Sequence, residues 1–215
     1  MAQPKFGVYI WATWITGLLS GEDHCAWAAN FKARFQYDKV ADEGFDSVAY
    51  NAAHKELVNR RVKELRDDGW AVTKEHQNAF KLRGKTAILA GKPDIIAIKD
   101  DVVLVSDPKT GARRNAHWWQ VAIYLLALTR VRKDLAGMTF VGELVYGDSE
   151  PQRITMSDVT PEVAARVWAQ VQEASFNIPP EKVPSEAECG FCNVPQSECP
   201  ERMAVTVAMG ETKEF

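Results

Sequence analysis

The segment PDIIAIKDDVVLVSDPK, residues 93–109, carries the clearest structural pattern in the chain. Its two β-rich runs, Ile95–Ile98 and Val102–Ser106, are separated by the polar triplet Lys-Asp-Asp. Two short apolar, β-branched runs around such a triplet are typical of a β-hairpin. Because the strands of a hairpin run antiparallel, Asp94 before the first strand and Asp107 after the second are expected at the same edge of the sheet.

Lys109 adds a cation at the same place. It follows Asp107 by two positions, so in an extended strand the two side chains point to one face. Neighbouring carboxylates repel one another unless a positive charge lies between them, and such oxygen ligands suit Mg²⁺ or Mn²⁺. The sequence therefore predicts a divalent-metal site at the rim of the hairpin. The alternative is that Asp94 and Asp107 are ordinary turn residues and Lys109 is a solvated strand end.

Helical and β patterns extend from the hairpin in both directions. Before it, residues 79–90 read as a further strand, which would complete a three-stranded antiparallel meander. Apolar residues at helical spacing predict a long helix over Asp46–Asp67 and an apolar helix over Trp118–Val131. This order predicts an α/β fold in which helices flank a small mixed sheet. The other predicted elements are helices at Val8–Leu19, Asp23–Tyr37 and Thr160–Phe176, and strands at Thr139–Tyr146 and Gln152–Met156.

Length and composition limit the classes of protein. The chain has 215 residues, 46% of them hydrophobic and 26% charged, which is typical of one globular domain. The formal net charge is −3, so the protein as a whole is not a polycation. Contact with nucleic acid would need a local basic strip. The basic residues near the hairpin are Lys81, Arg83, Lys85, Lys92, Arg113 and Arg114.

No run of about 20 apolar residues is present, so a membrane-spanning helix is not expected. Residues 6–19 are apolar enough to resemble part of a secretory signal, but tryptophans and threonines interleave there as on one face of a helix. We therefore expect a cytoplasmic protein. In a reducing compartment, the four cysteines point to metal or redox chemistry rather than to disulfides.

Three of the cysteines lie close together near the C-terminus, as Cys189-x2-Cys192-x6-Cys199, and the fourth is Cys25. Two thiols separated by two residues can bind one metal ion or cluster, and the third is within reach across a proline-rich segment. A [4Fe-4S] cluster and a zinc site with four cysteine ligands both fit this spacing. Buried free thiols are the third alternative, which the polar, proline-broken segment disfavours.

Four short motifs follow one another along about half of the chain: His54, Pro93-Asp94, Asp107-Pro108-Lys109 and Gln120-x3-Tyr124. Together they resemble the PD-(D/E)XK nuclease superfamily, and specifically its RecB-like branch. The resemblance implies a restriction-endonuclease-like core in which Asp94 and Asp107 hold Mg²⁺ or Mn²⁺. It also implies that His54 and the Pro108 carbonyl complete the protein ligands. Lys109 would then orient or activate the attacking water and offset charge on the transferring phosphoryl group.

Gln120 and Tyr124 are polar exceptions on an otherwise apolar helix, and at i and i+4 they share one face. A core helix tolerates such a pair when its hydrogen bonds are satisfied. The resemblance implies instead that both residues line a cleft and contact the DNA backbone. Arg113 and Arg114, which follow Lys109, would add positive charge there.

One early cysteine and three late ones resemble the iron–sulfur members of the RecB-like nucleases, including the CRISPR-associated Cas-four family and AddB. The resemblance implies that Cys25, Cys189, Cys192 and Cys199 hold a structural [4Fe-4S] cluster. Such a cluster would be a staple that joins the N- and C-terminal segments. Zinc is the alternative occupant of the same four thiols.

We expect a single domain over residues 1–215, with a helical N-terminal part (1–45), a nuclease core (46–178) and a cysteine-rich C-terminal segment (179–215). The resemblance implies a metal-dependent DNA exonuclease acting on single-stranded DNA, commonly from 5′ to 3′. A homo-oligomer, or proteins of CRISPR adaptation or recombination, are the implied partners. The alternatives are a catalytically weak, cluster-bearing DNA-binding or adaptor subunit, and a zinc-stapled nuclease.

Overall fold

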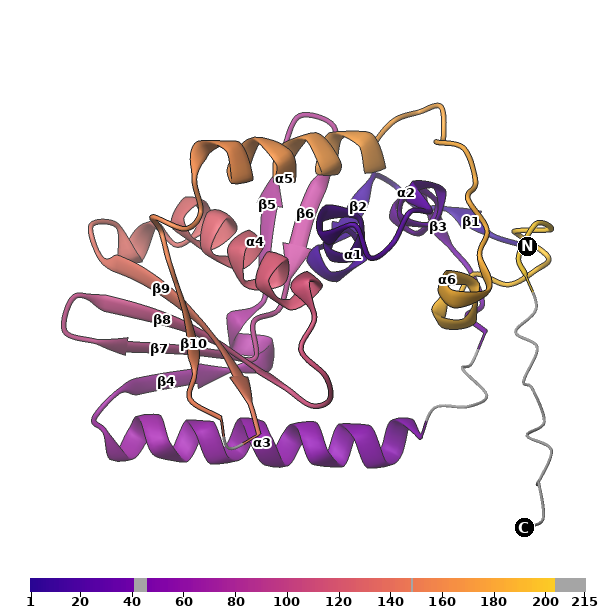
Figure 1. The fold of residues 1–215 in the computed structure, drawn as a ribbon. Coiled ribbons are helices and arrows are strands. Elements are labelled where there is room, and N and C mark those ends of the chain that lie inside the picture. Colours follow the sequence, from indigo (N-terminus) through magenta and orange to yellow (C-terminus); the bar gives the residue numbers. More distant parts are fainter. Residues whose placement is uncertain (41–45, 148, 204–215) are drawn as a thin grey trace, which may run out of the picture.

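The computed structural model describes residues 1–40, 46–147 and 149–203, and its larger sheet is a mixed one of five strands (Figure 1). The strand order is β10-β9-β8-β7-β4. Strands β8 and β9 are parallel, whereas the other neighbours are antiparallel. The strands are β4 (Ala71–Lys74), β7 (Ile95–Lys99), β8 (Val102–Lys109), β9 (Thr139–Tyr146) and β10 (Gln152–Thr155).

Two long helices, α3 (Ser47–Asp67) and α4 (Asn115–Val131), cover opposite faces of this sheet (Figure 1). Alternate strand residues explain the two-sided burial, because successive side chains of a strand point to opposite faces. Ile95 packs with the α3 cluster and Ile96 with the α4 cluster. The central strands are therefore apolar on both faces over Ile95–Ile98 and Val102–Val105, as their sequences indicate.

Helix α3 begins where the sequence predicts. The Asp46 side chain caps it by accepting hydrogen bonds from the amides of Val48 and Ala49. At its other end, Gly69 has a φ of 83°, a left-handed conformation that glycine adopts without steric cost. Helix α5 (Pro161–Ala174) is capped in the same way by Thr160, which accepts from the amide of Val163.

A second sheet of three strands corrects two predictions. Strands β5 (Phe80–Arg83) and β6 (Ile88–Gly91) form a hairpin of their own, and β2 (Tyr9–Trp11) runs parallel to β6. The predicted meander is therefore wrong, because β4 and not this hairpin pairs with β7. The predicted helix over Val8–Leu19 is wrong in its first half, since only the 3-10 turn Ala12–Trp14 and α1 (Thr16–Ser20) are helical.

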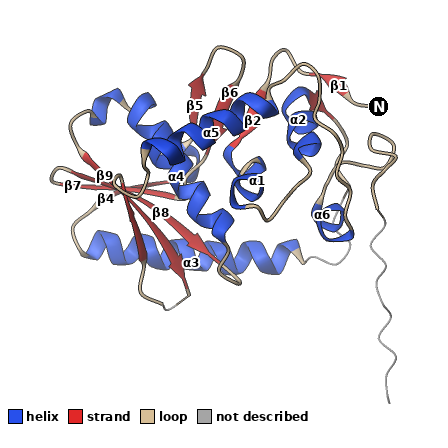
Figure 2. Ribbon diagram, turned by 45° about the horizontal axis from the view of Figure 1, so that its top comes forward, coloured by secondary structure: helices blue, strands red, loops and turns tan. Residues whose placement is uncertain are grey.

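The N- and C-terminal parts of the chain lie together at one end of the molecule (Figure 2). Trp27 and Phe31 of α2 (Ala26–Arg34) form a small apolar cluster with Val194 from the C-terminal segment. The remaining elements are β1 (Gln3–Pro4), β3 (Phe35–Gln36), the 3-10 turns Glu75–Asn78 and Lys133–Leu135, and α6 (Glu186–Phe191). Residues 41–45 of the expected N-terminal part and 204–215 of the expected cysteine-rich segment lie outside the described residues.

None of the helices in the described ranges combines the length and the hydrophobicity that a bilayer-spanning helix requires.

Candidate active site

The hairpin of β7 and β8 brings the predicted acidic residues to one end of the sheet. Ile95 pairs with Ser106, so Asp94 and Asp107 are the next residues outward on the two strands. The side chain of Asp107 is only 1% exposed, and its Oδ2 lies 2.7 Å from Nζ of Lys109. The predicted hairpin and the shared face of Asp107 and Lys109 are thus confirmed.

Gln120 of α4 connects these residues to the helix. Lys109 Nζ donates a hydrogen bond to Gln120 Oε1 at 2.9 Å, and Gln120 Nε2 donates to Asp107 Oδ1 at 3.2 Å. The same Nε2 also donates to the Tyr124 hydroxyl at 3.0 Å. Because Tyr124 is only 2% exposed, it lies behind the site and supports Gln120 from the core. The Gln120–Tyr124 pair thus holds the acidic and basic side chains in place.

His54 comes from α3 and reaches the other carboxylate. Its Nε2 lies 3.2 Å from Asp94 Oδ2, and the hydrogen bond with Asp94 raises the pKa of His54 despite its partial burial. The ring of Tyr50, one helical turn earlier, stacks on the imidazole with an interplanar angle of 11°. The structure therefore places His54 against Asp94.

Asp107 is buried, and its neighbours only partly compensate for the loss of solvation of its carboxylate. Desolvation raises the pKa of its carboxyl group to about 6; the charge of Asp94 adds to the rise, and Lys109 opposes it. Burial also works against the charge on Lys109, but Asp107 and Asp94 outweigh it and raise the pKa of the ammonium group. Although Lys109 lies within ion-pair distance, Asp107 Oδ2 has no aligned hydrogen bond. A buried oxygen in this state can still accept a cation.

The chemistry of the donors fits a hard divalent cation. Mg²⁺ commonly takes one or two carboxylates and completes its shell with water, so a full protein cage is not required. Asp94 and Asp107 supply such oxygens, His54 contacts Asp94, and Pro108 directly follows Asp107 in β8. Among the described residues, no three His, Cys, Asp or Glu side chains form a ready-made ligand set.

Pro108 lies in β8 where that strand is paired on one side. The pairing with β7 ends at Ser106, whereas the register with β9 continues through Pro108, opposite Val145, to Lys109. Strand pairing with β9 therefore continues past the proline. A proline is tolerated here because one side of the strand no longer has a β7 partner that needs its missing N–H.

A groove of about 620 Å³ opens beside Lys109, between α3 and the end of β9. Tyr146, which lies opposite Lys109 in the β8–β9 register, forms part of its wall. The Tyr146 hydroxyl is 2.8 Å from Nδ1 of His117, and the guanidinium of Arg113 lies 4.9 Å from the ring centroid of Tyr146. Burial and the nearby Lys109 and Arg114 lower the pKa of His117 to about 4, so the imidazole is neutral at pH 7.

The sequence did not indicate a role for Tyr146 or His117, because a tyrosine at a strand end and a lone histidine have no diagnostic spacing. Of the two arginines predicted to bind DNA, Arg113 lies against the groove wall. Arg114 instead forms an ion pair with Glu22, at 2.7 Å, and so joins the start of α4 to the N-terminal part.

A buried ion pair fixes α3 on the sheet. Glu143 of β9 is fully buried and accepts two hydrogen bonds from Arg61 of α3, at 2.8 and 3.0 Å. Arg153 of β10 lies 3.2 Å from the same carboxylate. Arg61 is two helical turns after His54, on the same side of the helix. The pair thus holds the helix that carries His54. A lone glutamate in the apolar run of β9 was the one signal in the sequence.

All four cysteines line one cavity of about 370 Å³ between α2 and the C-terminal segment. None of them forms a disulfide. Glu188 of α6 accepts hydrogen bonds from the amides of His24 and Cys25, both at 3.0 Å, and so ties the two ends of the chain together. Arg202 donates to the carbonyl oxygens of Cys192 and Val194. The structure therefore places Cys25 at the same cavity as the three late cysteines, as the resemblance implies.

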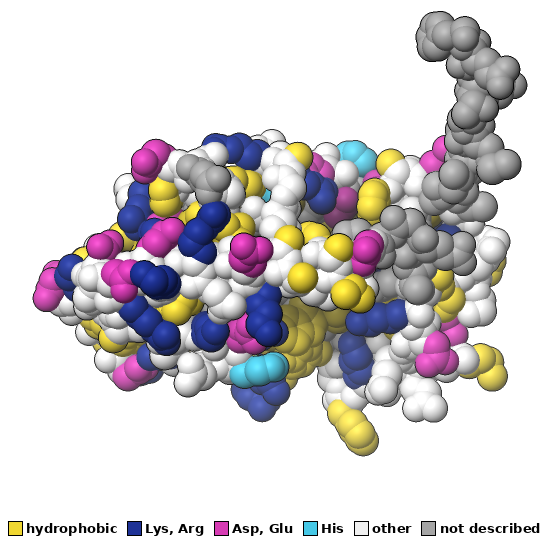
Figure 3. All heavy atoms as spheres, turned by 90° about the horizontal axis from the view of Figure 1, so that it is seen from below, with side chains coloured by type: hydrophobic (Ala, Val, Ile, Leu, Met, Phe, Trp, Pro, Cys, Tyr) yellow, Lys and Arg dark blue, Asp and Glu magenta, His cyan; other side chains and the backbone are white. Residues whose placement is uncertain are grey.

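Basic side chains border a recess on the α3 side of the molecule (Figure 3). Figure 3, which views the molecule from the α3 side, shows Lys and Arg side chains around a recessed hydrophobic area next to acidic groups. A local concentration of this kind is what a protein of net charge −3 needs to approach a polyanion.

Comparison with known proteins gives a family and solved structures of similar fold. A solved structure titled "Crystal structure of SSO0001" is similar at 14% sequence identity and a TM-score of 0.48, covering 94% of this chain and 90% of that one. No curated protein matches the sequence. The family model described as the PD-(D/E)XK nuclease superfamily matches residues 14–200. Because that match spans most of the chain, including the hairpin and the helix of Gln120, this protein belongs to the PD-(D/E)XK nuclease superfamily.

Proposed function

We propose that the chain is a metal-dependent nuclease that hydrolyses DNA phosphodiester bonds at Asp94, Asp107 and Lys109. The observation that carries the proposal is the buried contact between Asp107 and Lys109, 2.7 Å apart and both hydrogen-bonded to Gln120. Burying such a pair is costly, and here it stands at the open end of a sheet beside a second carboxylate. Membership of a nuclease superfamily supports the same reading.

The residues divide the work of hydrolysis. Asp94 and Asp107 would hold Mg²⁺ or Mn²⁺, with His54 and the Pro108 carbonyl as further ligands. Such an ion supplies Lewis-acid activation of the phosphate and of the attacking water when it is bound. The two carboxylates raise the pKa of the Lys109 ammonium group. Lys109 would orient or activate the attacking water and stabilise negative charge on the phosphoryl oxygens.

Gln120 positions the ammonium group of Lys109. Its amide accepts from Lys109 and donates to Asp107, so both side chains are held in one orientation before substrate arrives. Tyr124 fixes the amide in turn. Preorganised donors of this kind need no rearrangement as charge develops in the transition state. In the overall step, water forms a new P–O bond, the bond to the leaving oxygen breaks, and the proton from water ends on the leaving oxygen or in solvent.

We extend the proposal to exonuclease action on single strands, with 5′ to 3′ polarity, which follows from the resemblance to RecB-like nucleases. Labelled DNA tests it. Single and double strands carrying a label at either end are incubated with Mn²⁺, with Mg²⁺ or with EDTA. We expect stepwise loss of a 5′ label from single strands only when a metal ion is present. Degradation that continues in EDTA would contradict the proposed centre.

Lys109→Ala tests the proposed role of the lysine in the same cleavage assay. Losing one preorganised charge is expected to lower kcat by about 100- to 1000-fold. Lys99→Ala is the control, because Lys99 lies at the other end of the same hairpin, where its exposed side chain donates to the backbone of Asp68. Equal activity of the two variants would mean that the reaction occurs elsewhere.

We also propose that Cys25, Cys189, Cys192 and Cys199 bind a structural [4Fe-4S] cluster, with zinc as the alternative. The support is that all four thiols line one cavity although Cys25 is far from the others in sequence. Protein purified under anaerobic conditions should be brown, with broad visible absorbance that reductant bleaches. Elemental analysis should give about four iron and four sulfide ions per chain. Colourless protein with one zinc ion would support the zinc site instead.

A further inference from the structure

The outer face of the three-stranded sheet has no role in the proposed chemistry. Its strands alternate, with Ile10 of β2 and Leu89 of β6 buried in the core. The residues on either side of them point the other way, because side chains alternate along a strand. The outward residues are Tyr9 and Trp11 of β2, Ile88 and Ala90 of β6, and Lys81 and Arg83 of β5.

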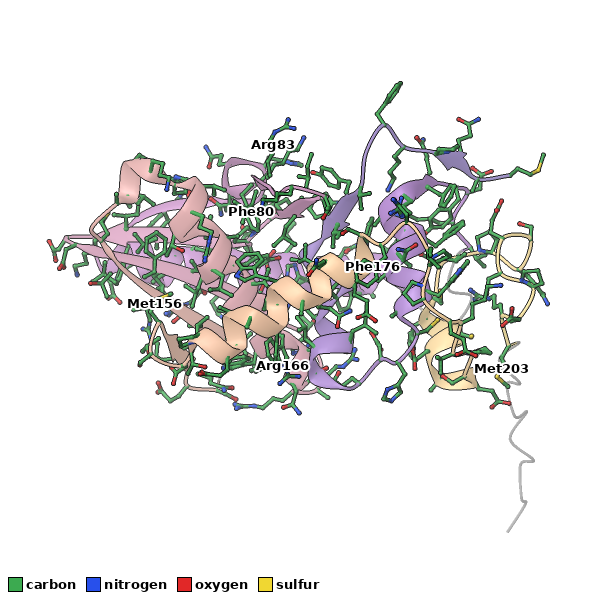
Figure 4. All side chains as sticks on the ribbon, turned by 90° about the horizontal axis from the view of Figure 1, so that it is seen from above. Phe80, Arg83, Met156, Arg166, Phe176 and Met203 are labelled. Atoms are coloured by element: carbon green, nitrogen blue, oxygen red, sulfur yellow. The ribbon has the colours of Figure 1, made fainter. Side chains whose placement is uncertain are left out.

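We call Tyr9, Trp11, Lys81 and Arg83 the aromatic–basic face. The two rings lie edge to face with centroids 6.0 Å apart, and Lys81 Nζ lies 5.6 Å from the centroid of Tyr9. Lys81 and Arg83 are exposed, while the rings are partly exposed. None of the three strands carries an acidic residue. Figure 4 shows Arg83 at the rim of the molecule, on the side away from α5, with Phe80 nearer the centre.

The strand register orders this face in two rows. Trp11 and Lys81 both align with Ala90, whereas Tyr9 and Arg83 both align with Ile88. The first row is the one next to the active site, because β6 ends at Gly91 and the chain reaches Asp94 three residues later.

Side-chain packing on the inner side of the three-stranded sheet also links this sheet to the active-site helix α4. Phe80 lies opposite Gly91, and its ring meets that of Tyr124 edge to face, with centroids 5.9 Å apart. A side chain at Gly91 would collide with both rings, so glycine permits this close approach. Tyr124 then bonds to Gln120, which holds Asp107. The sheet that carries the aromatic–basic face thus packs, through its inner side, on the helix that holds the active-site residues.

We propose that the aromatic–basic face binds single-stranded DNA and directs it to the active site, an inference that rests on the proposed nuclease function. Partly exposed rings can stack on unpaired bases, which a duplex does not present, and the cations match the phosphates between them. An apolar protein partner would gain nothing from Lys81 and Arg83. The absence of acidic residues on the three strands favours a polyanion.

Binding without cleavage tests the face directly. Fluorescence anisotropy of a labelled 20-nucleotide oligothymidine is measured in EDTA with the full chain as purified. Trp11→Ala is expected to weaken binding by roughly five-fold to a hundred-fold, the loss of one stacked base, and Trp11→Phe to retain most of the affinity. A Trp11→Ala protein that is folded by circular dichroism and binds as tightly as wild type would overturn the proposal.

The cations supply a test that does not depend on core folding. The double variant Lys81→Ala, Arg83→Ala removes two exposed side chains, and the slope of log affinity against log salt should become less negative by about 1.4. Lys133→Ala, an exposed lysine of the 3-10 turn after α4, is the control and should leave the slope unchanged. Equal slopes in both variants, or equal affinity of wild type for duplex and single strand, would overturn the proposal.

A separate experiment tests the proposed nuclease function independently of the aromatic–basic face. Asp107→Asn should bind the oligonucleotide like wild type but leave it uncut when Mn²⁺ is added. If Asp107→Asn still cleaves the DNA, the assignment of Asp107 to the catalytic centre is wrong. The affinities of the Trp11, Lys81 and Arg83 variants still test the aromatic–basic face in that case. If Asp107→Asn does not cleave and the variants of the aromatic–basic face bind DNA like wild type, the proposed nuclease function is supported. The proposed DNA-binding role of the aromatic–basic face is then wrong.

Discussion

The active site and the cysteine cavity are held in place by different forces. Asp107 and Lys109 lie on one strand, which pairs with β9 through Lys109 and with β7 as far as Ser106, and both side chains are hydrogen-bonded to Gln120. The cysteines come from the start of α2, from the short helix α6 and from loops, and few backbone ladders connect these segments. The sheet therefore defines the first site without a ligand, whereas the proposed cluster would supply much of the rigidity of the second.

The largest expected effect follows from that difference. Cys192→Ala should lower solubility and thermal stability before it changes the chemistry, because a structural metal centre can contribute on the order of 10 kcal/mol to folding. The thermal midpoint and the soluble fraction measure the change, with Ser197→Ala in the same loop as the control. A soluble, fully folded and inactive Cys192→Ala protein would mean that the cysteine region serves catalysis and not the fold.

The sheet region should respond to the loss of a buried charge instead. Glu143→Gln leaves Arg61 without its buried partner, which should cost about 3–5 kcal/mol in the free energy of unfolding by urea. Glu64→Gln is the matched control, because Glu64 pairs with the same Arg61 but is 49% exposed, so its loss should cost less than about 1 kcal/mol. Similar costs for both variants would show that burial of Glu143 does not fix α3 on the sheet.

A smaller effect should appear in the pH dependence of stability. The folded state lowers the pKa of His117 to about 4, so between about pH 6.5 and 4 the unfolded chain binds a proton that the folded chain does not. This group therefore makes stability fall as the pH is lowered through that window. His117→Gln should show a shallower loss in urea unfolding than wild type or the exposed variant His76→Gln. Parallel curves for all three proteins would rule out a neutral, buried His117.

Local sequence patterns predicted the helices and strands whose buried residues recur at a regular spacing. The helix over residues 46–67 and the strand Thr139–Tyr146 were predicted almost to the residue, because a cap and a β-branched run mark them. Residues 8–19 were not, because their mainly apolar run is compatible with a helix, yet Ile10 pairs in a parallel strand with β6. Parallel pairing across some 80 residues leaves no signal in a short apolar run.

Some residues of the candidate site could likewise be predicted from local sequence patterns, and others could not. The positions of Asp94, Asp107 and Lys109 follow from hairpin geometry, which the sequence encodes locally. The partners of Tyr146 and Glu143 depend on how α3 and α4 pack on the sheet, which a single sequence does not reveal. Tyr124 illustrates the limit: its spacing from Gln120 was visible, but only the structure places it behind the site rather than in the cleft.

The most direct test of the account compares two asparagine variants of one hairpin. Asp107→Asn removes the buried carboxylate, and Asp101→Asn changes an exposed turn residue at the hairpin's other end. The measurement is the rate of phosphodiester cleavage of labelled single-stranded DNA at pH 8 with Mn²⁺. We expect Asp107→Asn to lose at least about 100-fold in rate and Asp101→Asn to match wild type. Cleavage by Asp107→Asn at the wild-type rate would contradict the assignment of this hairpin as the catalytic centre.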